Sequence, residues 1–193
     1  MQSSTGKFIA AAAAILLLAS AIAGAADLRS IDVKREDDRY VLTSETYFEA
    51  SQAQLYAILT DYEQFKRFSN AFVVSENREP DEQGRPQFYT RMEGCVLLFC
   101  KAYIRAGYLE LQPMGDIVAT ADPEQSNFRF ARERWQLIPE GEGTIMIYDF
   151  EMEPDFWVPP VVGPFVIKRV LRSNGASAVK KIEILALGED PQD

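Results

Sequence analysis

The chain has 193 residues, among them 20 Lys and Arg, 29 Asp and Glu, and no histidine. The lack of histidine excludes a Ser-His-Asp triad, a Cys-His dyad and imidazole ligands for a metal. A formal net charge of −9 argues against nucleic-acid binding, which needs a basic surface. With 47% hydrophobic and 25% charged residues, the composition is that of a globular domain.

Residues 1–26 have the pattern of an export signal. Lys7 is followed by an apolar run over residues 8–19 and then by small residues. A basic start, a short apolar core and a small-residue cleavage site indicate a secretory signal peptide. The strongly apolar core is well short of the roughly 20 residues of a spanning helix, which disfavours a retained membrane anchor. We therefore predict cleavage after Ala25 or Ala26 and a periplasmic or otherwise extracytoplasmic location.

The remaining chain predicts one domain over residues 39–187, between an extended, charged lead-in (27–38) and an acidic tail (188–193). Alternating side chains predict a first strand at residues 39–48. Ser51 is a suitable N-cap for a following helix, and a second short helical piece begins at Asp61. Turn residues then separate six further strands, expected at residues 71–76, 87–93, 101–111, 117–121, 128–138 and 144–152, before a long amphipathic helix over 165–187.

This order of elements predicts an α+β fold. A strongly curved, seven-stranded antiparallel sheet would wrap around the long C-terminal helix, with two short helices after the first strand. Because one helix does not fill the space under such a sheet, we expect an apolar cavity between them. Gly175, in the middle of the helix, would mark either a bend or a close packing contact.

Three stretches resemble the helix-grip (SRPBCC) superfamily of START and polyketide-cyclase/coenzyme-Q-binding proteins. Residues 47–62 are similar to the first strand and helix pair of that family, residues 135–148 to its penultimate hairpin, and residues 154–164 to the connector of exported members. The resemblance implies the helix-grip fold for most of residues 39–187. The family includes lipid and quinone carriers, ligand-binding modules and a few cyclases, so the resemblance implies a cavity and not a reaction.

Side-chain alternation on the last two strands predicts the wall of this cavity. A regular final strand places its soft apolar side chains on one face, and the preferred register puts Trp135 beside Tyr148. On the other face, Arg132 and Arg134 would lie across from Glu151 and Asp149. Ordinary filled core is the alternative for the aromatic set. The expected ligand-binding residues are Glu133, Trp135, Leu137, Met146, Tyr148, Phe150, Met152, Phe156, Trp157, Ile167 and Leu171.

Glu133 would point inward on this pattern. An inward carboxylate must find a partner or stay protonated, and Arg91 or Arg105 on the middle strands is a candidate partner. It would then be placed to orient a ligand hydroxyl or carbonyl. The alternative is a shifted register that leaves Glu133 at the surface.

The connector before the long helix carries Phe156 and Trp157 among prolines that stiffen it. These aromatic side chains would gate the cavity or enter a membrane interface, or else form a structural plug. Lys168, Arg169 and Arg172 follow near the start of the helix, where the helix dipole does not favour them. They would attract anionic headgroups or form an ordinary solvated face.

Cys95 and Cys100 are the two cysteines of the chain. Five extended steps separate Cα atoms by roughly 16–18 Å, whereas a disulfide needs about 4.4–6.8 Å. Residues 96–99 contain no typical turn former, which favours a straight buried strand, whereas export favours a disulfide that pins an apolar loop. Two cysteines without histidine make a structural zinc site unexpected.

We therefore expect extracytoplasmic binding or transport of a hydrophobic small molecule, such as a lipid, an isoprenoid quinone or a polycyclic terpenoid. The alternatives are a polyketide cyclase or dehydratase, with Glu133, Tyr148, Tyr89 or an arginine as acid or base, and an envelope interaction module with a filled core. No catalytic residue, metal or cofactor is assigned. The expected partners are the hydrophobic ligand and, transiently, a membrane surface, with no nucleic acid, and the protein is expected to be a monomer.

Overall fold

A computed structural model describes residues 26–96, 99–160 and 163–191. The predicted signal peptide and the end of the acidic tail lie outside these residues. The elements in chain order are β1 (Asp27–Glu36), β2 (Arg39–Phe48), α1 (Gln52–Thr60), the 3-10 helix η1 (Tyr62–Gln64), α2 (Phe65–Phe68), β3 (Phe72–Arg78), β4 (Gln87–Val96), β5 (Phe99–Leu111), β6 (Ile117–Ala121), β7 (Phe128–Glu140), β8 (Gly143–Pro154) and α3 (Gly163–Ala186).

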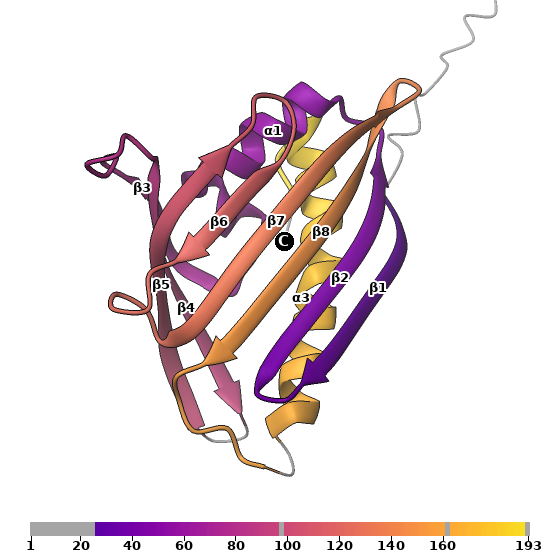
Figure 1. Cartoon of the computed structure of the whole chain (residues 1–193). Helices are drawn as coiled ribbons and strands as arrows, with labels where there is room; N and C mark the ends of the chain where they lie inside the picture. Colours follow the sequence, from indigo (N-terminus) through magenta and orange to yellow (C-terminus); the bar gives the residue numbers. More distant parts are fainter. Residues whose placement is uncertain (1–25, 97–98, 161–162, 192–193) are drawn as a thin grey trace, which may run out of the picture.

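The described residues form one antiparallel sheet with the strand order β1-β2-β8-β7-β6-β5-β4-β3. Strands β3 to β8 are therefore a meander, and the pairing of β2 with β8 brings the start of the chain beside its last strand. The sheet curves around α3, which lies against its inner face, while α1 lies near one end (Figure 1). This architecture confirms the predicted α+β helix-grip fold.

The sheet contains eight strands and not the predicted seven, because the charged lead-in belongs to it as β1. Leu28 pairs with Thr46 and Ser30 with Glu45, so Arg29 is an extra residue in a β-bulge. The bulge shifts the alternation of inward and outward side chains by one position. The inward-facing side chains of β1 therefore do not follow a regular period of two in the sequence. The sheet accordingly extends upstream of residue 39.

The short helices after β2 form where their caps predict. Ser51 makes a capping box with Gln54 at the start of α1, and the Asp61 side chain accepts a hydrogen bond from the Glu63 backbone at the start of η1. The Tyr62 ring in η1 then stacks on Phe88 of β4, with ring centroids 4.5 Å apart. Packing between the helices and the sheet thus closes one end of the domain.

A buried carboxylate ties α3 to the corner between β2 and α1. Glu183 is 1% exposed, and its Oε1 accepts hydrogen bonds from the backbone N–H groups of Glu49 and Ala50, at 3.0 and 3.2 Å. Burial raises the pKa of Glu183, and these two hydrogen bonds partly oppose that shift. The second half of α3 is thereby held against the domain.

Two glycines allow close approaches that shape the interior. A Cβ on Gly107 of β5 would lie 2.0 Å from the Thr120 carbonyl oxygen of β6, so the strands could not pack as they do with any other residue there. A Cβ on Gly175 would lie 3.2 Å from Cδ1 of Ile31. Gly175 therefore marks a close packing contact between α3 and β1.

Strands β4 and β5 are antiparallel neighbours, and Cys95 is paired in register with Cys100. The straight-strand alternative is therefore wrong, because β4 and β5 pair along their length and bring the backbone of the two cysteines side by side. The side chains of both cysteines lie outside the described residues. The disulfide stays a prediction, supported by the Cα separation of about 4.5–5.5 Å that is typical of directly paired antiparallel residues.

Candidate functional site

A cavity of about 160 Å³ lies between the inner face of the sheet and α3. Its walls are mainly apolar side chains, contributed by every strand except β6 and by all three α-helices. The interior is therefore not completely filled, as the curvature of the sheet over one helix predicts. This cavity is the candidate site.

Six of the predicted ligand-binding residues line this cavity, namely Glu133, Trp135, Met146, Tyr148, Phe150 and Leu171. The predicted register is also confirmed, because Trp135 pairs with Tyr148 and their rings stack with centroids 5.4 Å apart. The alternation along β7 and β8 thus identified the correct face of both strands.

The other predicted residues do not line the cavity. Leu137 packs in the main hydrophobic core, and Met152 and Ile167 pack in a second cluster. The alternation of side chains shows which face of a strand is buried, but not which part of that face lines the cavity. The cavity lies along the middle of β8, so Met152 near its end is not part of the wall. Phe156 packs on Tyr103 of β5, with ring centroids 4.5 Å apart, whereas Trp157 is 75% exposed.

Much of the opposite wall was not predicted from the sequence. Leu28 and Ile31 of β1 and Phe65 and Phe68 of the short helices line the cavity. The signal for β1 was obscured by the bulge at Arg29. The aromatic pair at i and i+3 in α2 is visible in the sequence, but its spacing does not distinguish a cavity wall from filled core.

A polar cluster of three side chains lies in the otherwise apolar wall. Arg105 is 3% exposed and Glu133 is 6% exposed. The Arg105 guanidinium donates two hydrogen bonds to the Glu133 carboxylate, Nη1 to Oε1 at 2.8 Å and Nη2 to Oε2. The Tyr148 hydroxyl donates a third, to Oε1 at 2.9 Å. Arg105 is therefore the partner of an inward Glu133, and Arg91 pairs instead with Glu93.

The electrostatics of this cluster give it no net charge at neutral pH. Burial alone would lower the pKa of Arg105, but the attraction of Glu133 outweighs this and raises it. Burial and the nearby Glu133 charge raise the pKa of Tyr148 well above its ordinary value, so the tyrosine keeps its proton. Tyr62, which is also fully buried, has its pKa raised for the same two reasons.

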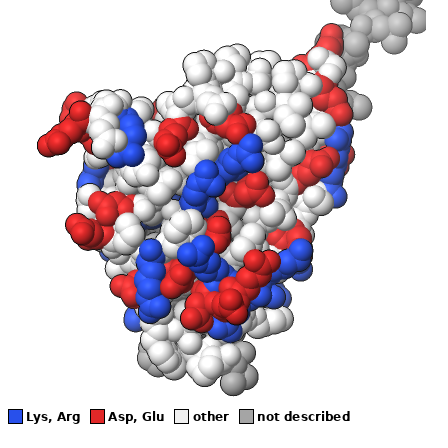
Figure 2. Space-filling view, viewed as in Figure 1, with Lys and Arg blue, Asp and Glu red and all other residues white. Residues whose placement is uncertain are grey.

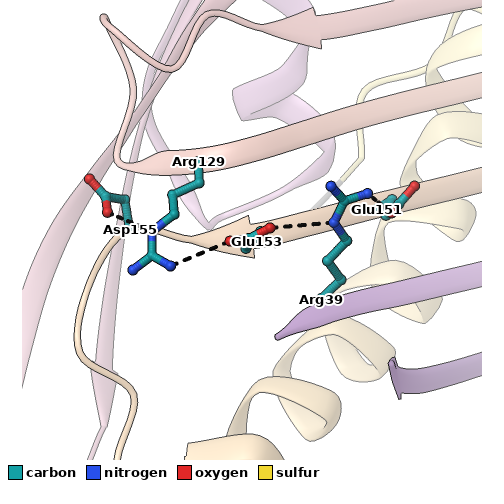
Figure 3. Close-up of polar contacts among 5 residues, drawn as sticks. All are labelled: Arg39, Arg129, Glu151, Glu153 and Asp155. Carbon is teal, nitrogen blue, oxygen red and sulfur yellow. Dashed lines mark hydrogen bonds and ion pairs between the residues drawn. The ribbon is translucent and has the colours of Figure 1, made fainter. Parts of the chain in front are cut away.

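The outer face of the sheet carries interspersed charges of both signs (Figure 2). An open hollow of about 430 Å³ on this face is lined mainly by polar and charged side chains, among them Glu110, Asp116, Arg132 and Arg134. Arg132 and Arg134 are opposite Glu151 and Asp149 in register, as predicted, but Arg134 forms its ion pair with Asp116 at 2.6 Å. A chain of exposed or partly exposed ion pairs, each worth little energetically, joins Arg39, Glu151, Glu153, Arg129 and Asp155 (Figure 3).

Within the described ranges, no helix is long and apolar enough to cross a membrane. The same residues contain no group of three or more acidic or thiol side chains suited to hold a metal ion.

Comparison with known proteins agrees with this geometry. The model of the family described as "Polyketide cyclase / dehydrase and lipid transport" matches residues 40–183, whereas no curated protein matches the chain. A START superfamily protein from Mycobacterium smegmatis has a similar structure, with 19% identity, a TM-score of 0.59, and coverage of 75% of this chain and 98% of that one.

Two further solved structures share the fold. A STAR-related lipid transfer protein from Xanthomonas axonopodis is 13% identical, with a TM-score of 0.59 and coverage of 81% of this chain and 98% of that one. The Zhui aromatase/cyclase from a Streptomyces species is 11% identical, with a TM-score of 0.56 and coverage of 77% and 94%. At these identities the likeness concerns the fold alone.

Proposed function

Because the chain belongs to the polyketide cyclase / dehydrase and lipid transport family, we propose that it binds and carries a hydrophobic small molecule in the cavity between the sheet and α3. The observation that carries this proposal is an apolar, unfilled interior with one buried and charge-balanced polar cluster in its wall. The N-terminal pattern supports a periplasmic or otherwise extracytoplasmic carrier, acting as a monomer that contacts a membrane surface transiently to exchange its cargo.

The polar cluster favours a ligand with an uncharged polar group. Arg105 and Glu133 already neutralise each other, so a charged ligand group would be buried without a counter-charge. The Tyr148 hydroxyl donates its hydrogen bond to Glu133, and its oxygen can still accept one from a ligand. Arg105 also has N–H groups other than the two that bind Glu133. A ligand hydroxyl or carbonyl fits these groups, which supports a neutral lipid, an isoprenoid quinone or a polycyclic terpenoid.

The size of the cavity limits how such a ligand is held. Sites for drug-sized ligands usually measure about 300–1,000 Å³, and this cavity is smaller. A whole lipid can enter only if the walls move apart. In the second half of α3, Val179, Ile182 and Leu185 are buried, whereas Gly163 is the one buried residue before them. We therefore expect the first half of α3 to be the wall that moves.

The cluster gives little support to the enzyme alternative. A general base must be free to take a proton, but both Glu133 oxygens are engaged by Arg105. Tyr89, another candidate, lies under the Arg78 guanidinium, 4.1 Å from the ring centroid to Cζ, and its neighbour Phe88 takes the inward position. Binding without turnover is the function that this arrangement favours.

Native mass spectrometry tests the proposal. Mature protein should be purified from the periplasm of a bacterial host, and also refolded and incubated with extracted membrane lipids. We expect a neutral lipid class to remain bound in both cases. Absence of retained lipid in both preparations would contradict the carrier proposal.

A matched pair of variants on α3 ties any retained lipid to the cavity. Ala178 lines the cavity, so Ala178→Phe should fill it and abolish retention. Ala176 does not line the cavity, and Ala176→Phe on the same helix should leave retention unchanged. Equal retention by both variants would place the ligand elsewhere.

A further inference from the structure

The segment that ends the sheet and begins α3 differs in charge from the rest of the chain. Residues 156–182 contain five Lys and Arg and no Asp or Glu, in a chain whose formal net charge is −9. Three of these cations, Lys168, Arg169 and Arg172, lie in the first turns of α3.

These three cations also lack the partners that arginines on the sheet have. Arg39, Arg129 and Arg134 each lie within ion-pair distance of a carboxylate. Among the described residues, none of Lys168, Arg169 and Arg172 forms an ion pair, and the two arginines are exposed. These three charges therefore remain available to a partner outside the chain.

Large apolar side chains are exposed beside these cations. Trp157 is 75% exposed and Phe165 is 67% exposed. Phe165, Arg169 and Arg172 are spaced i, i+4 and i+7 and so share one face of α3. The start of α3 lies at the lower end of the molecule in Figure 1.

We propose that this basic-aromatic end, defined by Trp157, Phe165, Arg169 and Arg172, docks on the surface of an anionic membrane. Tryptophan is favoured at the membrane–water interface, and arginines attract anionic headgroups. Leu171, on another face of the same helix, lines the cavity, so docking brings a wall of the cavity to the lipid surface. Docking itself does not depend on the proposed function, whereas the exchange of cargo at the membrane does.

Vesicle co-sedimentation of the mature protein tests this surface. The probes are vesicles of phosphatidylcholine alone and vesicles in which about a third of the lipid is phosphatidylglycerol. We expect binding to the anionic vesicles that weakens as salt is added, and much weaker binding to the neutral ones. Arg169→Gln/Arg172→Gln should bind anionic vesicles roughly 25-fold more weakly, at about fivefold for each arginine.

A second double variant with the same loss of charge is the control. Arg132 on the outer face of β7 and Lys180 in the second half of α3 are exposed. If the position of the charges matters and not the net charge, Arg132→Gln/Lys180→Gln should bind anionic vesicles within about twofold of the wild type. Equal weakening in both double variants, or equal binding to neutral and anionic vesicles, would overturn the docking surface.

Fluorescence and mass spectrometry separate the docking proposal from the carrier proposal. Emission of exposed Trp157 should shift to the blue on anionic vesicles, a shift that Trp157→Phe removes while buried Trp135 remains. Arg169→Gln/Arg172→Gln should still retain ligand in native mass spectra. Retention without docking would refute the docking surface alone, and docking by a protein that retains no ligand would refute the carrier proposal alone.

Discussion

Replacement of Arg105 by methionine isolates the energetic role of the buried pair. The variant removes the guanidinium and leaves the Glu133 carboxylate 6% exposed, without its two hydrogen bonds from Arg105. Breaking a buried pair on one side typically costs about 3–5 kcal/mol, because an uncompensated charge stays buried. A domain of this kind has a total stability of about 5–15 kcal/mol, so Arg105→Met should remove a large share of it.

The double variant Arg105→Met/Glu133→Leu should recover most of that loss. Apolar residues of similar volume commonly replace a buried ion pair at little cost, and the remaining deficit should be about 1 kcal/mol for the hydrogen bond that Tyr148 loses. Urea denaturation, monitored by tryptophan fluorescence, measures the free energy of unfolding of the wild type, the single variant and the double variant. A loss below about 1 kcal/mol in the single variant, or no recovery in the double variant, would refute the buried-pair assignment.

The same double variant separates stability from ligand recognition. If the pair orients a polar ligand group, the double variant should fold normally and yet retain less of the ligand found by native mass spectrometry. Unchanged retention would show that the apolar walls alone hold the ligand.

Three further predictions follow from single contacts. Because burial raises the folded-state pKa of Glu183 above its ordinary 4.5, stability from this group is present below that value and is lost as the pH rises through the raised pKa. Glu183→Gln should thus gain stability relative to wild type between pH 4.5 and neutrality in urea titrations, and a pH-independent difference would contradict this. Gly107→Ala should destabilise by about 3 kcal/mol, because its Cβ would meet the backbone of β6; near-native thermal unfolding would count against that close approach. Mature protein should lack two hydrogens by intact mass and regain them on reduction, and two free thiols would end the prediction of a bond between Cys95 and Cys100.

The sequence predicts the local elements well where side-chain alternation is uninterrupted. The bounds of β2 and β6 agree with the expected residues 39–48 and 117–121. On β7 and β8, regular alternation over a long run was sufficient to predict the pairing of Trp135 with Tyr148. In each case a buried face with period two fixes the register, because a slip of one residue would expose it.

The partner of Glu133 required the three-dimensional structure. Arg105 lies on β5 and Glu133 on β7, and β6 lies between these strands. Ala119 and Ala121, on the buried face of β6, are small enough for the guanidinium to reach across, and β6 ends at Ala121. This contact joins two strands that are not neighbours, and it depends on small side chains and on the end of β6. Such a contact produces no periodic pattern in the sequence.

The pairing of β2 with β8 also determines when the domain can be completed. Tyr40 of β2 lies opposite Met152 of β8, so these two neighbouring strands are far apart in the sequence. Contacts so distant in sequence must overcome a large loop-closure entropy and slow the folding of a domain. Until the last strand has been synthesised, β1 and β2 have no edge to join, and the helix that follows has no complete inner surface to cover. A chain synthesised from its N-terminus therefore stays open for most of its length.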